Sequence, residues 1–328
     1  MLEWLPSSIR SVLLPMTSEF ADKAEEIRIR IHRPLEIAYS GGYAYVAAGG
    51  GATREPALAY RPSKEDGLKL LDRITNHSLY TLEEELRRGY ITVRGGHRIG
   101  LAGRVILEQG EVRSLKDISG FNIRIAREIP GAADKLIPYL RETHSAEYLH
   151  TLIISPPQRG KTTILRDIAR IAASRLNSNP GATHSAPADR PRKVGIVDER
   201  SEIAACIDGI PTFDIGSRTD VLDACPKAEG MMMMIRALSP EILIVDEIGR
   251  SEDTMAVLEA MHAGITVIAT AHGRNLEDVK LRPTLAPLFA EKAFQRYVIL
   301  QSTGATGQIV EVYDNAGKRI FAASERLL

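Results

Sequence analysis

Gly160, Lys161 and Thr162 form a sequence whose residue types can hold an anion. They follow an apolar run of strand length that ends at Ile154, and they precede apolar residues at helical spacing. A short loop and the first turn of a helix direct unpaired backbone N–H groups at a phosphate, and the helix dipole adds partial positive charge. Lys161 can reach the β- and γ-phosphates of a nucleotide, and the Thr162 hydroxyl suits Mg²⁺. The pattern predicts a phosphate-binding P-loop with ATP and Mg²⁺ as ligands.

The predicted loop departs from the usual P-loop pattern at one position, because Ser155 stands where the first glycine is expected. Glycine lets the chain turn sharply off the strand, and serine tolerates a positive φ poorly. The prolines that follow fix φ near about −65° and can hold the loop open. An ordinary strand–turn–helix with an exposed lysine is the alternative interpretation. The residues predicted to bind the nucleotide are Ser155, Pro156, Pro157, Gln158, Arg159, Gly160, Lys161, Thr162 and Thr163.

Two further apolar runs, residues 194–197 and 242–245, each end in an Asp-Glu pair. Ligands of a parallel sheet lie beyond the carboxyl ends of its strands, so both pairs are expected beside the P-loop. Asp246 can hold Mg²⁺ through water, and Glu247 can orient and deprotonate an attacking water. The other pair, Asp198-Glu199, offers a second candidate base. Acids at strand ends also serve as ordinary helix caps.

His272 follows another apolar run, residues 265–270. A histidine just past a core strand of this sheet can sense a γ-phosphate, although a single histidine is more often structural. The predicted catalytic residues are therefore Glu247, Lys161, Glu199 and His272, and the predicted metal ligands are Thr162 and Asp246.

Length and composition indicate how many domains the chain forms and which kinds of partner and setting it favours. A chain of 328 residues with 44% apolar residues fits two folded domains. Lysine plus arginine equal aspartate plus glutamate at 42 each, so no global charge favours nucleic acid or membranes. The two cysteines make no metal-ligand spacing and indicate a reduced, cytoplasmic setting. We expect neither a signal peptide nor a membrane span, since no apolar run approaches about 18–20 residues.

The order of the expected elements differs between the two parts of the chain. Residues 1–143 mix strands and helices, including the alternating strand 26–31 and a hairpin at Gly41-Gly42, and predict an α+β domain. Ser63 can cap one helix, and Thr81 with Glu84 can cap another. Residues 144–328 alternate strand and helix, which predicts an α/β domain with a parallel sheet.

Residues 87–127, near the end of the first expected domain, are rich in arginine. Only three acids accompany its nine basic residues, so we expect a basic surface there, or else solvated strand faces. A basic surface can meet the nucleotide of a neighbouring subunit or a nucleic acid. The basic residues are Arg87, Arg88, Arg94, Arg98, Arg104, Arg113, Lys116, Arg124 and Arg127.

Residues 240–272 resemble the corresponding stretch of the secretion-ATPase superfamily, the hexameric motors of type II and type IV secretion and type IV pili. The resemblance implies a RecA-like P-loop ATPase domain in which Asp198-Glu199 matches the Asp box, Asp246-Glu247 the Walker B region and His272 the His box. It also implies a homo-oligomer, with an arginine of one subunit reaching the nucleotide of the next.

The rest of the chain is most similar to sporulation members of that superfamily, through residues 79–90, 95–100, 156–163 and 165–170. That likeness implies membrane proteins of a sporulation channel complex as partners. It also implies a cytoplasmic protein, peripheral at a membrane on the mother-cell side, for which nucleic acid is an unlikely partner. Gly249-Arg250 and Ile265 depart from residues that many secretion ATPases carry.

Two other functions remain open from the sequence. One is a nucleic-acid-binding protein with an ATP-driven switch, which would use the basic segment. The other is a small-molecule kinase built on the same P-loop. Kinases exclude water, whereas Glu247 placed to activate water favours hydrolysis.

Overall fold

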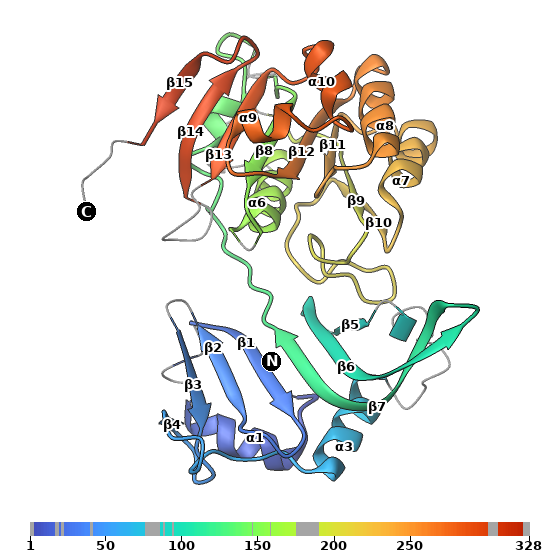
Figure 1. Ribbon diagram of the computed structural model, residues 1–328. Helices are drawn as coiled ribbons and strands as arrows, with labels where there is room; N and C mark the ends of the chain where they lie inside the picture. Colours follow the sequence, from blue (N-terminus) through green and yellow to red (C-terminus); the bar gives the residue numbers. More distant parts are fainter. Residues whose placement is uncertain are drawn as a thin grey trace. The chain divides into compact units, whose positions relative to one another are not determined.

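The computed structural model of the chain describes residues 3–16, 20, 23–39, 42–75, 86–87, 89–93, 95–145, 147–157, 159–174, 190–300 and 308–323. The chain forms two compact units, Met1–Arg127 and Glu128–Leu328 (Figure 1). Within the described ranges, no helix combines the length and the apolar character that crossing a bilayer requires.

The first unit is an antiparallel sheet in the order β4-β3-β2-β1-β7-β6-β5 with two main helices. Its core joins apolar residues of both helices to the inward side chains of β1, such as Ile27 and Ile29. The expected alternating strand and Ser63 cap are present. The two strands of the expected hairpin pair, with Gly42 inside the second strand opposite Tyr39. Thr81 and Glu84, the expected cap of the next helix, lie outside the described residues. The elements are α1 (Ser7–Leu13), β1 (Ala24–Arg30), β2 (Glu36–Tyr39), β3 (Gly42–Val46), β4 (Ala52–Thr53), α3 (Lys64–Ile74), β5 (Tyr90–Val93), β6 (His97–Glu108) and β7 (Glu111–Arg124).

Most described arginines of the basic segment have partners inside the first unit. Arg124 lies 3.3 Å from Glu26, an acid on the neighbouring strand β1 that a count along the segment misses. Glu26 is shared, because it also pairs with Arg28 at 2.8 Å. The other contacts are Arg104 with Asp117 at 2.5 Å, Arg113 with Glu108 at 3.1 Å, and the Arg98 guanidinium 3.6 Å from the centre of the Tyr90 ring. Arg94 lies outside the described residues.

His97 at the start of β6 is a buried titratable group. Its side chain is 7% exposed, and its Nδ1 accepts a hydrogen bond from the Ala126 backbone N–H at 3.1 Å. Burial lowers the pKa of His97 from 6.5 to about 4. The unfolded chain therefore takes up a proton below about pH 6.5, whereas the folded unit resists it until about pH 4. Acid favours the unfolded chain across this window.

We predict that the free energy of unfolding of the first unit falls by about 1–2 kcal/mol between pH 7 and pH 5 because of His97 alone. The reporter is Trp4, the single tryptophan, whose ring centre lies 6.3 Å from that of His97. Urea unfolding followed by Trp4 fluorescence measures this decrease. In His97→Gln, which cannot titrate, the decrease should shrink by that amount. An identical pH slope in both proteins contradicts the assignment.

The second unit is a sheet in the order β10-β9-β11-β12-β8-β13-β14-β15. The strands from β10 to β13 are parallel, and β14 and β15 continue the sheet antiparallel. The expected parallel α/β domain is confirmed, and the one strand that the sequence pattern missed is the edge strand β10. The strands are β8 (Thr151–Ser155), β9 (Val194–Asp198), β10 (Thr219–Asp223), β11 (Ile242–Val245), β12 (Thr266–His272), β13 (Arg296–Leu300), β14 (Ile309–Asp314) and β15 (Arg319–Ala322).

Helices cover both faces of this sheet. One core contains α5 and α6 with strand residues such as Ile153, Ile196 and Ile244. The other contains α7 to α10 with alternate strand residues such as Leu152, Leu243 and Val245. The helices are α5 (Ile137–Leu140), α6 (Lys161–Ala173), α7 (Lys227–Met233) with a π-helical continuation Met234–Leu238, α8 (Ser251–His262), α9 (Leu276–Lys280) and α10 (Ala286–Ala290).

The border between the units falls earlier than residue 143, where the sequence places it. Ala133, Leu136 and Leu140 are fully buried in the core that contains α6. The Asp167 carboxylate on α6 accepts a hydrogen bond from the Ala133 backbone N–H at 2.8 Å. The segment after Gly131 therefore packs as part of the second unit.

Candidate nucleotide site

The register of the parallel strands brings the predicted residues to one edge of the sheet. His272 at the end of β12 pairs with Ser155 at the end of β8. Val245, the last residue of β11, pairs with Val197 of β9 and with Ala269 of β12. The P-loop, both acid pairs and His272 therefore follow neighbouring strand ends, as the sequence predicts.

The P-loop begins without the turn that its usual first glycine would provide. Ser155 is the last residue of β8, is fully buried, and is not among the residues with a positive φ. Its Oγ donates to the Pro156 carbonyl at 2.9 Å. The left-handed residue is instead Gly160, the N-cap of α6, with φ 85°. Serine is accommodated because the strand continues through this position.

The other predicted loop residues differ in exposure. Pro157 is exposed, whereas Pro156, Arg159, Thr162 and Thr163 are half-buried. Gln158 lies outside the described residues.

The Lys161 ammonium is buried at the centre of the site. The residue is 4% exposed, and Nζ lies 3.3 Å from the Ser155 carbonyl oxygen and 3.1 Å from that of Pro156. Burial lowers the pKa of Lys161, and the charges of Asp246 and Glu247 oppose that effect. The P-loop lysine thus rests on carbonyls of its own loop.

His272 connects this lysine to the predicted base. Its Nδ1 lies 3.1 Å from Lys161 Nζ, and its Nε2 lies 3.0 Å from Glu247 Oε1. An ammonium group only donates, so Nδ1 accepts from Lys161 and the ring proton lies on Nε2, the nitrogen that faces Glu247. His272 therefore lies in polar contact with both Lys161 and Glu247.

Glu247 is held from a second side by a residue that sequence reasoning missed. Arg200 Nη1 lies 2.9 Å from Glu247 Oε2. The Glu247 backbone has φ 55°, which non-glycine residues adopt at a cost, and such strain clusters at functional sites. Arg200 directly follows the Asp-Glu pair of β9, so its place in the sequence was the available signal.

Thr270, inside β12, joins both acids of the second pair. Its fully buried hydroxyl accepts from the Glu247 backbone N–H at 2.8 Å and donates to Asp246 Oδ1. The other carboxylate oxygen, Oδ2, accepts from the Thr162 hydroxyl at 2.7 Å. A threonine within a β-branched run carries no sequence signal of this role.

The two acids of the Asp198-Glu199 pair make different contacts. Asp198 is buried and accepts backbone N–H groups of Glu202, Ile203 and Ala204, each at 2.9 Å. Burial raises the pKa of Asp198 to about 6, against the effect of these donors. Its carboxylate therefore holds the loop after β9.

Glu199 forms an ion pair with Lys227, the first residue of α7. Partial burial would raise the pKa of Glu199, but the Lys227 hydrogen bond and charge lower it below its usual value. Glu199 lines a small polar cavity together with Glu247 and Arg200. It takes no part in the contacts that link Lys161 to Glu247 through His272.

Arg166 of α6 holds the same loop from its carbonyl side. The buried guanidinium donates to the carbonyls of Ile203 and Glu202, both at 2.6 Å, and lies 4.1 Å from the centre of the Phe213 ring. Burial lowers the pKa of Arg166 to about 10. The helix that follows the P-loop is thereby tied to the loop that follows Glu199.

The fold and this arrangement define a class of protein: P-loop proteins with the RecA-like fold of secretion ATPases. The X-ray structure of the ATPase DotB from Legionella pneumophila superposes with a TM-score of 0.60 at 15% identity, over 95% of this chain and 82% of that chain. The crystal structure of the pilus retraction motor PilT with bound ADP gives a TM-score of 0.52 at 13% identity, over 88% and 77%.

The sequence identifies the family within that class. The family model described as sporulation stage III, protein AA, matches residues 1–320. Stage III sporulation protein AA of Bacillus subtilis is 50% identical over 315 residues, which are 96% of this chain and 94% of that protein. The chain belongs to the sporulation stage III protein AA family.

We predict that Thr270→Val lowers the free energy of unfolding of the second unit by about 1–3 kcal/mol. The substitution leaves the buried Glu247 N–H without its acceptor and removes the hydroxyl that donates to Asp246. Thr270→Ser keeps the hydroxyl and serves as the matched control. Thermal unfolding by calorimetry measures both variants. Unchanged stability in Thr270→Val, or a larger loss in Thr270→Ser, contradicts this role of the Thr270 hydroxyl.

Proposed function

We propose that this protein is an ATP-hydrolysing motor of the secretion-ATPase type that acts during sporulation. The observation that carries the proposal is the position of His272 between Lys161, to which it is hydrogen-bonded, and Glu247, whose Oε1 lies 3.0 Å from His272 Nε2. It links a group suited to bind the terminal phosphates with a carboxylate suited to activate water. The fold of ATPase relatives supports the same conclusion.

The residues present fit a nucleotide with Mg²⁺. Thr162 and Asp246 bring a hydroxyl and a carboxylate within 2.7 Å, and oxygen ligands of this kind are what Mg²⁺ uses beside phosphates and water. Thr162 and Asp246 would hold the ion, which would supply positive charge against the charge that develops on the phosphates. Thr270 fixes the Asp246 carboxylate, and the Gly160 cap opens the first turn of α6 toward the phosphates.

In the proposed reaction, Glu247 takes the proton of a water whose oxygen attacks the γ-phosphorus. The bond from that phosphorus to the bridging oxygen breaks, and ADP and phosphate leave. His272 and Arg200 orient the Glu247 carboxylate from its two oxygens. Lys161 must exchange its loop carbonyls for phosphate oxygens, which changes the contact it makes with His272. Phosphate binding is thereby linked to the position of the base.

We further propose that the protein works as a homohexamer in the mother-cell cytoplasm, docked on membrane proteins of a sporulation channel complex. The family membership supports the sporulation role, and the resemblance to secretion motors supports the ring. The second candidate, a nucleic-acid switch, would use the basic segment, in which Arg104, Arg113 and Arg124 each contact an acid.

Lys161→Ala should weaken ATP binding, because the cation for the β- and γ-phosphates is lost while the backbone N–H groups remain. Lys280→Ala, at an exposed lysine of α9, is the control and should bind normally. Titration calorimetry with Mg·ATP measures both. Equal affinity in the two variants contradicts the assignment of the P-loop.

Glu247→Gln should retain Mg·ATP but hydrolyse it about 10²–10⁴-fold more slowly, since the amide cannot take the proton. Glu199→Gln, which removes a carboxylate bound to Lys227, should slow hydrolysis much less. Phosphate release without any added acceptor measures the rates and separates hydrolysis from kinase activity. A larger loss in Glu199→Gln, with binding intact, would place the base on β9.

A further inference from the structure

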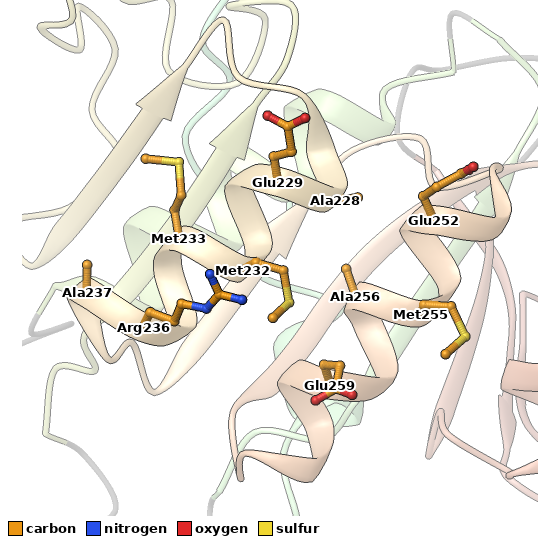
Figure 2. Close-up of a pocket in the computed structure, with 10 residues that line it drawn as sticks. All are labelled: Ala228, Glu229, Met232, Met233, Arg236, Ala237, Glu252, Met255, Ala256 and Glu259. Atoms are coloured by element: carbon orange, nitrogen blue, oxygen red, sulfur yellow. The ribbon is translucent and has the colours of Figure 1, made fainter.

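A groove with a volume of about 800 Å³ lies between α7 and α8, apart from the nucleotide site (Figure 2). Three methionines, Met232, Met233 and Met255, are among the residues that line it. Met233 is 52% exposed and Met255 is 58% exposed, so the groove is open to solvent. Figure 2 shows Met232 of α7 and Arg236 of the π-helical continuation extending toward α8.

Helical spacing explains why these side chains face outward together. On α8, Glu252, Met255 and Glu259 are separated by three and four residues and are all exposed. On α7 and its continuation, Glu229, Met233 and Arg236 have the same spacing. The opposite stripes of both helices are buried against the sheet.

The groove is preformed because α7 lies very close to β9. A Cβ atom at Gly230 would lie 2.5 Å from Val197 Cγ1, so glycine permits this approach. Met231 and Met234, on either side of the outward stripe, are fully buried. The wall that α7 provides is therefore fixed by packing.

We propose that this groove binds a basic amphipathic helix of a partner protein. Two packed helices that expose an apolar groove can accept a third helix along it. Methionine side chains adapt to varied apolar side chains of a partner. The rim carries three glutamates, Glu229, Glu252 and Glu259, against one arginine, Arg236. That excess of negative charge selects lysine or arginine beside the apolar stripe of the partner.

Val105, Leu107 and Val112, at the end of the β6–β7 hairpin, are among the exposed large apolar residues that the structure describes. The charges there are paired within the hairpin, Arg104 with Asp117 and Arg113 with Glu108, and supply no excess of positive charge. This hairpin therefore does not match the groove, and the proposed occupant is another protein.

The test uses the full-length protein without nucleotide, so its outcome is independent of ATP hydrolysis. The probe is a fluorescein-labelled peptide of about 14 residues, long enough to span the 12 residues of α8, with leucine at helical spacing and lysine elsewhere. Its control replaces every lysine with glutamate. Fluorescence anisotropy should show saturable binding of the lysine peptide and none of the glutamate peptide.

Two pairs of variants locate the binding. Met255→Glu should weaken the lysine peptide roughly tenfold or more, whereas Leu281→Glu, at a residue 82% exposed outside the groove, should not. Glu259→Lys should weaken it roughly fivefold, whereas Glu277→Lys on α9 should not.

Equal affinity in every variant, or equal binding of both peptides, overturns the proposal. So does a lower mass of Met255→Glu in sedimentation, because the groove would then be an interface between subunits.

Discussion

The buried ammonium of Lys161 is the charge on which the rest of the site depends. A cation that is 4% exposed must be compensated, because desolvation of an unpaired charge is costly. Two loop carbonyls and His272 provide direct contacts, and Asp246 and Glu247 lie near enough to influence the pKa of Lys161. Only adjacent parallel strands ending at one edge place these groups around a single atom. The order of the strands and the compensation of the Lys161 charge therefore depend on each other.

Charge compensation at Lys161 extends into the surrounding loops. The Glu247 carboxylate is shared by His272 and Arg200, and Thr270 sets the backbone of Glu247 and the carboxylate of Asp246. Across the site, Arg166 ties α6 to the loop after β9, whose N–H groups Asp198 holds. A displacement of the P-loop helix would therefore reach the loop that carries Arg200.

The two helices that form the groove also begin at this site. Lys227, the first residue of α7, pairs with Glu199, and α8 begins at Ser251, shortly after Glu247. A helix bound in the groove would contact the same two elements that position acids beside the P-loop. Such a contact is one physical route by which a partner and the nucleotide could influence each other.

The sequence by itself determined the elements whose causes are local. Apolar periodicity specified α6 and the parallel strands other than the edge strand β10, and the Gly-Lys-Thr motif and strand-end acids indicated the edge of the sheet at which the candidate site lies. The pairing of Arg124 with Glu26, the contacts of Thr270 and Arg200, and the division of labour between Asp198 and Glu199 needed the tertiary structure. These contacts join residues far apart in the chain, so no local pattern encodes them. The border before Gly131 was decided in the same way, because only packing against α6 shows to which core residues 133–140 belong.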